Sequence, residues 1–408
     1  MKCRHCKALL SLPLIDLGLA PPSNAYLSKQ QLQQPEKKYP LRVLVCKTCW
    51  LAQTEDFAQA NELFDADYAY FSSFSSTWLE HASHYTREVT ARFHLHASSH
   101  VVEIAANDGY LLQYFRAANI PCTGVEPTAS TAAAARAKGI EIVQEFFGVA
   151  LANKLAAQGK QADLMTANNV LAHVPDINDF VAGFVALLKP GGVATFEFPH
   201  LVQLMAQNQF DTIYHEHFSY LSLTAVQRIF ATNGLTLFDV QELPTHGGSL
   251  RVFAQRHGTG KQPVSDSVST ILRAEDAVGV RDDHYYLAFQ ARAEKVKEDF
   301  VNFLLESRRC GRSVAAYGAA AKGNTLINFA ALGADLIQYV VDKNPAKQGK
   351  FMPGSRIPIV SPDVLAESRP DYLVILPWNI ADEVRQQNAA LAKLGTQFAT
   401  AVPKLEIV

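Results

Sequence analysis

The feature that most constrains the fold is the stretch V-V-E-I-A-A-N-D-G-Y-L-L at residues 101–112. A short apolar run leads into a tight loop containing Gly109 and then into a helix-forming segment, and a second apolar run ends in Glu126. This is the pattern of a βαβ unit, with an acidic residue at the ~20-residue distance expected of a nucleotide-binding half. The sequence therefore predicts a doubly wound α/β domain that binds a ligand at this loop.

The composition of the loop indicates which ligand. A dehydrogenase loop reads G-x-G-x-x-G so that the backbone can approach a pyrophosphate, but here Asn107 occupies a glycine position. S-adenosylmethionine (SAM) presents an amino acid moiety and no diphosphate at this place, and its two ribose hydroxyls suit the carboxylate of Glu126. We therefore predict SAM as the cofactor, with S-adenosylhomocysteine as its product. The predicted cofactor-binding residues are Glu103, Asn107, Gly109, Glu126 and Asn168.

Two later segments continue the same domain. Residues 162–173 predict a fourth strand that runs into a polar loop, and residues 187–197 predict a helix end, a sharp turn and a fifth strand. The L-K-P-G-G turn in this place is a frequent mark of class I methyltransferases. Strands are expected at 101–104, 121–126, 163–167 and 193–197, with helices at 77–93, 130–138 and 177–188.

Near the N-terminus, four cysteines form two knuckles, Cys3-x-x-Cys6 and Cys46-x-x-Cys49. In a reducing compartment this spacing suits one tetrahedral Zn²⁺ better than disulfides, because two-residue spacing lets both thiolates of a knuckle face one ion. Four thiolates leave no position for water, so we predict a structural zinc ion. Between the knuckles, residues 17–27 are turn-rich and residues 39–46 alternate as a strand.

Length and charge limit the classes of protein that remain. The chain has 408 residues, enough for two or three domains, and its 37 basic residues nearly balance 39 acidic ones. No block of like charge stands out, so we expect neither a nucleic-acid partner nor a membrane partner. The first cysteines follow Met1 without a signal-peptide core, which predicts a cytoplasmic protein. We expect a monomer or a weak oligomer.

Residues 211–221, D-T-I-Y-H-E-H-F-S-Y-L, carry acids, bases and hydroxyls at a density that a structural segment rarely needs. Its H-E-H lacks the i, i+4 histidine pair of the H-E-x-x-H zinc proteases, so metal binding is disfavoured. General acid/base chemistry is the favoured interpretation, with a satisfied hydrogen-bond cluster as the alternative. An aromatic and hydroxyl-rich segment at residues 64–76 suits a surface that closes over a polar ligand.

The second half of the chain predicts another doubly wound unit. Residues 257–263 read as a linker, residues 267–309 as a long charged helical stretch, and residues 313–325 as a strand, a glycine loop at Gly318 and a helix start. A second strand is expected at 339–345 and a later one at 372–379. Since ligands sit at the carboxyl ends of such strands, Trp378 and Asn379 should share a cleft with the Gly318 loop. Lys322 at the helix start suits a phosphate group.

The whole order of motifs closely resembles the nucleotide-sugar C-methyltransferases. The resemblance rests on the cysteine knuckles, E-I-A-x-N-D-G-Y-L, Y-H-E-H-F-S-Y-L, H-G-G-S-L-R, Y-G-A-A-A-K-G-N-T-L and V-D-x-N-P-x-K-Q-G, and it covers nearly the whole chain. It implies a zinc-binding domain at 1–70, a class I SAM methyltransferase domain of Rossmann-like fold at 71–260 and a second Rossmann-like α/β domain at 261–408. The implied substrate is a nucleotide-diphosphate sugar held between the last two domains, typically a 4-keto-hexose methylated at C-3.

The resemblance also implies roles for individual residues. His217 matches the general base, with Tyr214, Glu216 and His173 beside it, and either Tyr68 or Tyr70 as a further active-site group. A base and a donor to the enolate oxygen are what carbon methylation next to a ketone requires, and histidine and tyrosine fit these two roles. The implied substrate-binding residues are His246, Lys322, Asn324, Trp378 and Asn379.

Other functions remain open at this level. A zinc-ribbon RNA methyltransferase would also join four cysteines to a SAM domain, but it predicts a basic groove, whereas the charge here is balanced. A non-catalytic sugar-nucleotide-binding protein would leave the acid/base cluster at 214–217 unexplained. Within the enzyme class, methylation at C-5 or at a sugar hydroxyl is the alternative to methylation at C-3.

Overall fold

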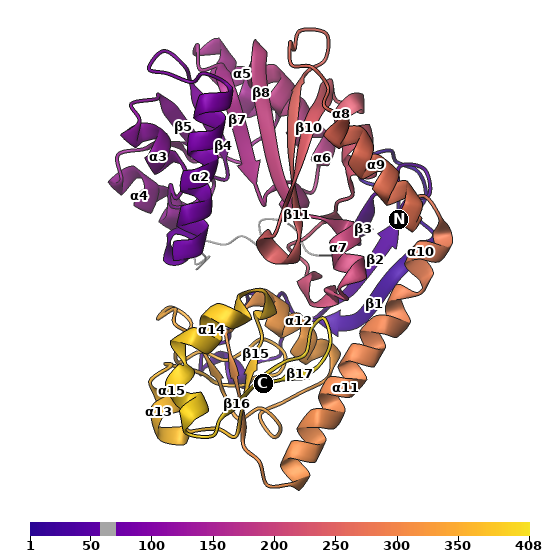
Figure 1. Cartoon of the computed structure of the whole chain (residues 1–408), viewed down its shortest axis with the longest axis vertical. Helices are drawn as coiled ribbons and strands as arrows, with labels where there is room; N and C mark the ends of the chain where they lie inside the picture. Colours follow the sequence, from indigo (N-terminus) through magenta and orange to yellow (C-terminus); the bar gives the residue numbers. More distant parts are fainter. Residues whose placement is uncertain (58–70) are drawn as a thin grey trace.

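The computed structural model describes residues 1–57 and 71–408, so Tyr68 and Tyr70, the two candidate active-site tyrosines, lie outside the described residues. Within the described ranges the strands form three sheets of four, seven and six strands. The seven-stranded sheet lies at the top of Figure 1, the six-stranded sheet lies at the bottom, and the four-stranded sheet lies to one side between them. The predicted α/β fold class is confirmed.

The four-stranded sheet carries the cysteine knuckles. Its antiparallel strands are β1 (Leu12–Ala20), β2 (Tyr39–Val45) and β3 (Ala52–Thr54), and β9 (Ser219–Tyr220) from the middle of the chain completes it. The prediction of a turn-rich segment from residue 17 onward was wrong at its start, because β1 continues to Ala20. Register shifts between Pro13 and Ile15 and between Asp16 and Leu19 allow the strand to pass Gly18.

The seven-stranded sheet has the order β10-β11-β8-β7-β4-β5-β6. Five strands are parallel, and the β10–β11 hairpin adds an antiparallel edge. All four predicted strands are present. L-K-P-G-G lies at the start of β8 and forms an irregularity in the pairing with β7, because Ala162 pairs with Leu188 and Leu164 pairs with Val193. The strands are β4 (Val101–Ile104), β5 (Cys122–Val125), β6 (Glu141–Val143), β7 (Ala162–Asn168), β8 (Leu188–Pro199), β10 (Leu235–Leu243) and β11 (Ser249–Arg256).

Helices cover this sheet with apolar faces. Side-chain caps mark several helix starts: Ser75 accepts a hydrogen bond from Trp78 N, and Asp176 accepts from the amides of Asn178 and Asp179. The helices are α2 (Ser76–Arg92), α3 (Leu112–Ala117), α4 (Ala129–Ala137), α5 (Val149–Ala157), α6 (Ile177–Leu187), α7 (Leu201–Ala206) and α8 (Leu223–Thr232).

The single helical stretch expected at 267–309 is divided into α9 (Asp266–Val278), α10 (Asp283–Leu287) and α11 (Phe289–Arg309). Gly279 adopts a left-handed conformation with φ of 94° and ends α9, and the Asp282 side chain caps α10. In Figure 1, α11 runs beside the four-stranded sheet and down to the six-stranded sheet. Its buried face joins apolar residues of β1, β2 and the C-terminal strands in one core.

The six-stranded sheet has the order β14-β13-β12-β15-β16-β17; the first five strands in this order are parallel, and β17 pairs antiparallel with β16. The predicted strand at 339–345 is short, covering Val340–Val341. Its strands are β12 (Val314–Tyr317), β13 (Val340–Val341), β14 (Ile359–Val360), β15 (Tyr372–Ile375), β16 (Gln397–Thr400) and β17 (Glu406–Ile407). Its helices are α12 (Ala321–Phe329), α13 (Val364–Ser368), α14 (Ala381–Gln387) and α15 (Ala389–Lys393).

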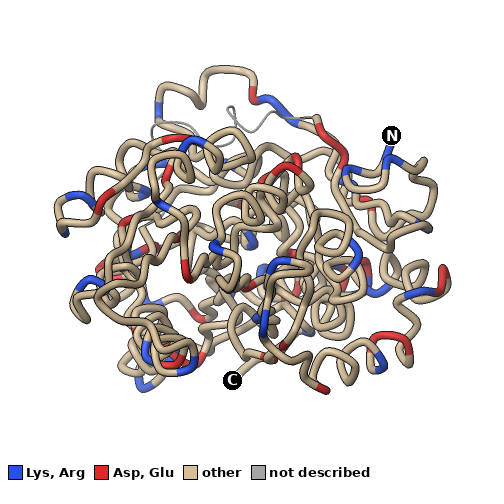
Figure 2. The backbone as a smooth tube through the Cα atoms, turned by 90° about the horizontal axis from the view of Figure 1, so that it is seen from above, with Lys and Arg blue, Asp and Glu red and all other residues tan. Residues whose placement is uncertain are grey.

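In the view of Figure 2, basic and acidic residues are interspersed along the described part of the backbone. None of the described helices is both long enough and apolar enough to cross a membrane.

Candidate functional site

The loop after β4 is held against the end of β5 by Glu126. One carboxylate oxygen accepts a hydrogen bond from Asn107 N at 2.9 Å, and the other accepts from Thr128 N at 2.9 Å. Asn107 has φ of 49°, the left-handed conformation that asparagine tolerates better than most residues. A carboxylate offers about four lone-pair positions, so these two bonds leave acceptors for ribose hydroxyls. We call this end of the seven-stranded sheet, with Glu103, Asn107–Gly109, Glu126 and Asn168, the cofactor edge. The free acceptor positions of Glu126 there fit the ribose of SAM.

Two further predicted cofactor residues lie buried at neighbouring strand ends. Burial raises the pKa of Glu103 well above its usual value; the nearby Tyr110 hydroxyl opposes the shift and the Glu126 charge adds to it. Asn168 Oδ1 accepts from Thr166, while its buried Nδ2 has no hydrogen-bond partner among residues 1–57 and 71–408. An unpaired buried donor costs free energy, which a polar ligand would recover.

Gly109 serves the packing of the loop. Its φ is 76°, and a Cβ atom there would lie 2.4 Å from Ile140 Cδ1. The glycine is therefore required by the protein neighbours behind the loop, independently of any contact with the cofactor. In front, the amides of Ser72 and Ser73 donate to Asn107 Oδ1 and Asp108 Oδ2 at 3.0 and 3.3 Å, so the segment preceding α2 rests on the loop.

The predicted base, His217, lies in the segment between the 3-10 helix Phe210–Thr212 and β9. Its Nδ1 hydrogen bonds to the carbonyl oxygen of Thr212 at 2.9 Å, and since a carbonyl only accepts, Nδ1 carries the proton and Nε2 keeps its lone pair. The Tyr214 ring lies 4.0 Å away and the His173 ring 4.5 Å away, measured between centroids. Burial lowers the pKa of His217 well below its usual value, and the neighbouring His173 adds to the effect.

Burial also lowers the pKa of His173 to about 4. Both imidazoles are therefore neutral near pH 7, the state in which a histidine can accept a proton. Glu216 faces elsewhere: one of its oxygens accepts from Asn24 Nδ2 at 2.6 Å, and burial raises its pKa to about 7. Of the predicted catalytic group, His217, Tyr214 and His173 lie together, and Glu216 connects this cluster to the N-terminal region.

The C-terminal region contributes three predicted residues to the same place. Trp378 Nε1, in the short 3-10 helix Trp378–Ile380, donates to the buried carboxylate of Asp211 at 2.8 Å. Lys322 Nζ donates to Asn379 Oδ1 at 2.7 Å and lies 4.5 Å from the centre of the Trp378 ring. Burial raises the pKa of Asp211 to about 6, although the Lys322 charge opposes the shift. Lys322, Asn379 and Trp378 thus contact one another beside Asp211, in the segment that leads to His217.

The remaining two predicted substrate residues, His246 and Asn324, lie in different surroundings. His246, with φ of 54°, accepts from Asn169 Nδ2 through Nε2 at 3.2 Å, and its ring lies 5.3 Å from the Trp78 ring. Burial lowers the pKa of His246 to about 4. Asn324 is 1% exposed and donates to Ser23 O at 2.6 Å, so its amide joins α12 to the N-terminal region.

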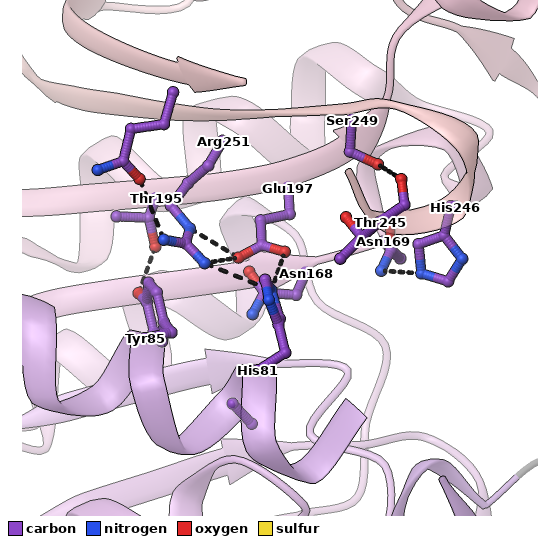
Figure 3. A network of polar contacts seen from close by, with 12 residues as sticks. His81, Tyr85, Asn168, Asn169, Thr195, Glu197, Thr245, His246, Ser249 and Arg251 are labelled. Carbon is purple, nitrogen blue, oxygen red and sulfur yellow. Dashed lines mark hydrogen bonds and ion pairs between the residues drawn. The ribbon is translucent and has the colours of Figure 1, made fainter. Parts of the chain in front are cut away.

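A buried ion-pair network that was not predicted from the sequence lies beside Asn168 (Figure 3). Glu197, at the end of β8, accepts from Arg251 Nε at 2.7 Å and from His81 Nε2 at 2.8 Å. Arg251 also lies 3.1 Å from the carboxylate of Glu88 in α2. The available signal was the arginine of H-G-G-S-L-R, placed in a strand interior where an unpaired charge is rarely buried.

The four knuckle cysteines meet at one point, with their sulfur atoms all within 4.8 Å of one another. Cys3 Sγ lies 3.5 Å from Cys49 Sγ, and Cys6 Sγ lies 3.4 Å from Cys46 Sγ. A tetrahedral ion with Zn–S distances of ~2.3 Å requires sulfur atoms about 3.7 Å apart. The predicted zinc site is confirmed as a fit of four thiolates to one ion.

Family models match three consecutive parts of the chain: a zinc binding domain at residues 3–64, a methyltransferase domain at 78–240 and a C-methyltransferase C-terminal domain at 244–403. Together with the cofactor edge and the cysteine cluster, they define a SAM-dependent methyltransferase with an N-terminal zinc-binding domain. The C-methyltransferase NovU of Streptomyces niveus is 33% identical over 407 residues, covering 100% of this chain and 96% of NovU. The chain therefore belongs to this family of C-methyltransferases, with SAM and zinc as its cofactors.

Other matches cover a part of the chain. The ubiquinone biosynthesis O-methyltransferase of Bordetella avium is 31% identical over 98 residues, which are 24% of this chain and 41% of that protein. The magnesium protoporphyrin IX methyltransferase structure from Synechocystis PCC 6803 with bound SAH has a TM-score of 0.36, 14% identity and coverage of 44% and 83%. The PH0226 structure from Pyrococcus horikoshii has a TM-score of 0.39, 14% identity and coverage of 49% and 99%.

Proposed function

We propose that this C-methyltransferase acts on a nucleotide-linked 4-keto deoxysugar, at the C-3 carbon next to the ketone, with His217 as the general base. The observation that carries the proposal is the hydrogen bond from Nδ1 of His217 to Thr212 O. It fixes the tautomer in which Nε2 is the proton acceptor. A base held in one tautomer is what removal of a proton from carbon requires.

The residues around His217 suit the charge changes of such a reaction. Nε2 would take the C-3 proton as the C–H bond breaks, leaving an enolate whose charge lies mainly on the ketone oxygen. Burial is the main reason that the pKa of His217 is lowered, and the Lys322 cation adds a smaller effect in the same direction, so its charge acts at this site. The Tyr214 ring, 4.0 Å from His217, brings a hydroxyl-bearing side chain to the same place. SAM, when bound, supplies an electrophilic methyl group.

The nucleotide part of the substrate would lie between the middle and C-terminal regions. Lys322, Asn379 and His246 supply polar groups there, and Trp378 supplies an aromatic face. Asn324 would act indirectly, by holding α12 against the N-terminal region, because its side-chain amide already donates to Ser23 O. Either Tyr68 or Tyr70 remains a prediction as a further active-site group. We place domain boundaries at 1–70, 71–260 and 261–408.

The position of the new methyl group tests the proposed function. The enzyme would be incubated with SAM carrying a ¹³C-methyl group and a nucleotide-linked 4-keto-6-deoxyhexose, and the product examined by NMR. A methyl group bonded to C-3 is expected. A methyl group on oxygen, or on C-5, would contradict the proposal, and failure to methylate any nucleotide sugar while SAM binds would remove this substrate class.

A further inference from the structure

The zinc-binding region and the segment that carries His217 are joined by a strand pairing. β3 pairs antiparallel with β9, so that Ala52 lies opposite Tyr220 and Gln53 opposite Ser219. β9 begins two residues after His217. The backbone just after His217 is therefore paired with β3, the strand that follows the second cysteine knuckle.

Thr54, the last residue of β3, binds this backbone at two successive carbonyl groups. Its hydroxyl donates to His217 O at 3.1 Å, and its amide donates to Phe218 O at 3.2 Å. Thr54 is 3% exposed, so water does not compete for either bond. Two hydrogen bonds from one residue fix the peptide from which the His217 side chain projects.

The neighbour of Thr54 binds the cysteine cluster. Gln53 is fully buried; its Nε2 donates to Cys3 Sγ at 3.2 Å, and its Oε1 accepts from Arg4 N at 2.8 Å. Consecutive residues of a strand point to opposite faces. Gln53 therefore contacts Cys3 Sγ, while Thr54 contacts residues 211–219, which carry His217 and are called the base segment. Residues next to metal ligands commonly fix their orientation through such bonds.

Arg4, between the first two cysteines, reinforces the same connection. Its Nη2 donates to Thr54 O at 3.1 Å, and its guanidinium lies 5.3 Å from the centre of the Phe218 ring. Arg4 is 5% exposed and Phe218 is 2% exposed. The first knuckle thus contacts the segment around His217 through Arg4 and Phe218, and the strand that follows the second knuckle contacts it through Thr54.

We propose that the four-cysteine zinc site positions the His217 backbone through Gln53 and Thr54, in addition to stabilising the N-terminal fold. Both are positioning residues, and the inference rests on the proposed role of His217 as the base. Loss of the ion would release β3 and, with it, the hydrogen bonds to His217 and Phe218. Misplacement of a catalytic group by about 1 Å can cost roughly 10²-fold in rate.

A pair of variants at one position tests the proposal. Thr54→Val keeps the shape of the side chain and removes the hydroxyl, whereas Thr54→Ser keeps the hydroxyl. Thr54→Val should lower kcat for methyl transfer about tenfold, within the roughly 10²-fold limit for misplacement. KM for the acceptor, SAM affinity and zinc content should stay unchanged, and Thr54→Ser should retain a kcat close to that of the unaltered enzyme.

Thr86→Val is the matched control, because Thr86 is 4% exposed and donates to Ala82 O at 2.9 Å. It loses the same kind of hydrogen bond, but one whose donor and acceptor both belong to α2, so kcat should change little. Equal losses in Thr54→Val and Thr54→Ser, or in Thr54→Val and Thr86→Val, would overturn the proposal.

Hydrogen–deuterium exchange gives a readout that does not depend on activity. Amides of residues 212–221 should exchange faster in Thr54→Val and in the unaltered enzyme after zinc removal by a chelator, while amides of β4 and β5 keep their protection. Unchanged exchange in both samples would overturn the proposal. If His217→Asn still transfers methyl groups, the proposed function fails, and the exchange result still decides whether zinc and this segment are coupled.

Discussion

The cofactor edge and the base segment are built in different ways. The Asn107 loop accepts and donates hydrogen bonds within its own domain, to Ser72 in the segment before α2 and to Glu126, which in turn accepts from Thr128 N. The base segment at 211–219 is held by Thr54 and Asn24 from the N-terminal region and by Thr325 and Trp378 from the C-terminal region. Cofactor binding should therefore survive distant changes that disturb proton transfer.

Removal of the base should have the largest effect. His217→Asn keeps a side-chain amide that can donate to Thr212 O but removes the Nε2 lone pair. Methyl transfer should fall by about 10² to 10⁴-fold, the usual contribution of a general base, with SAM affinity unchanged. Calorimetric titration of SAM beside a methyl-transfer assay checks both. A parallel loss of SAM affinity would show that the two edges are not independent.

A change at the cofactor edge should give the opposite pattern. Glu126→Ala should weaken SAM binding by roughly one to two decades, because it removes charge-assisted hydrogen bonds to the ribose and the tether to Asn107 N. Glu141→Ala is the control, since it removes a carboxylate from β6 in the same sheet, at an exposed position. Titration calorimetry should show near-normal SAM affinity for the control. Similar losses in both variants would contradict the assignment of Glu126.

A smaller effect is expected where the C-terminal region meets the base segment. Trp378→Phe keeps an aromatic ring for Lys322 and removes the N–H that donates to Asp211. One lost hydrogen bond should raise KM for the nucleotide sugar by about 2- to 10-fold, while SAM affinity stays constant. Steady-state kinetics with both substrates varied measure the two constants. A change in the KM for SAM with no change in the KM for the nucleotide sugar would contradict this assignment and indicate that Trp378 contributes to cofactor binding.

The smallest effect concerns pH. Burial and the neighbouring His173 lower the pKa of His217, so the neutral base persists below the pH at which an ordinary histidine becomes protonated. Between pH 7.5 and 6, kcat/KM should fall less than about twofold, whereas a base with a pKa of ~6.5 would lose about fourfold. The pH profile of kcat/KM checks this. An acid limb centred at or above pH 6.5 would show that the site does not depress this pKa.

The difference between these two regions explains which contacts could be predicted from the sequence. The cofactor edge follows from local spacing, because loop, strand and Glu126 lie within one βαβ unit. The partners of the base segment do not, since Thr54 and His217 are 163 residues apart and meet only through the pairing of β3 with β9. The Glu197–Arg251–His81 network was missed for the same reason. The break between α9 and α10 depended on one left-handed glycine, Gly279, inside an otherwise helical pattern.

The central claim, that His217 removes a proton from carbon, can be measured without methyl transfer. A nucleotide-linked 4-keto-6-deoxyhexose would be incubated in D₂O with the enzyme and S-adenosylhomocysteine, and exchange at the ring carbons followed by proton NMR. We predict enzyme-dependent exchange at C-3 that is lost in His217→Asn. Exchange that persists in His217→Asn at the rate of the unaltered enzyme would contradict the account.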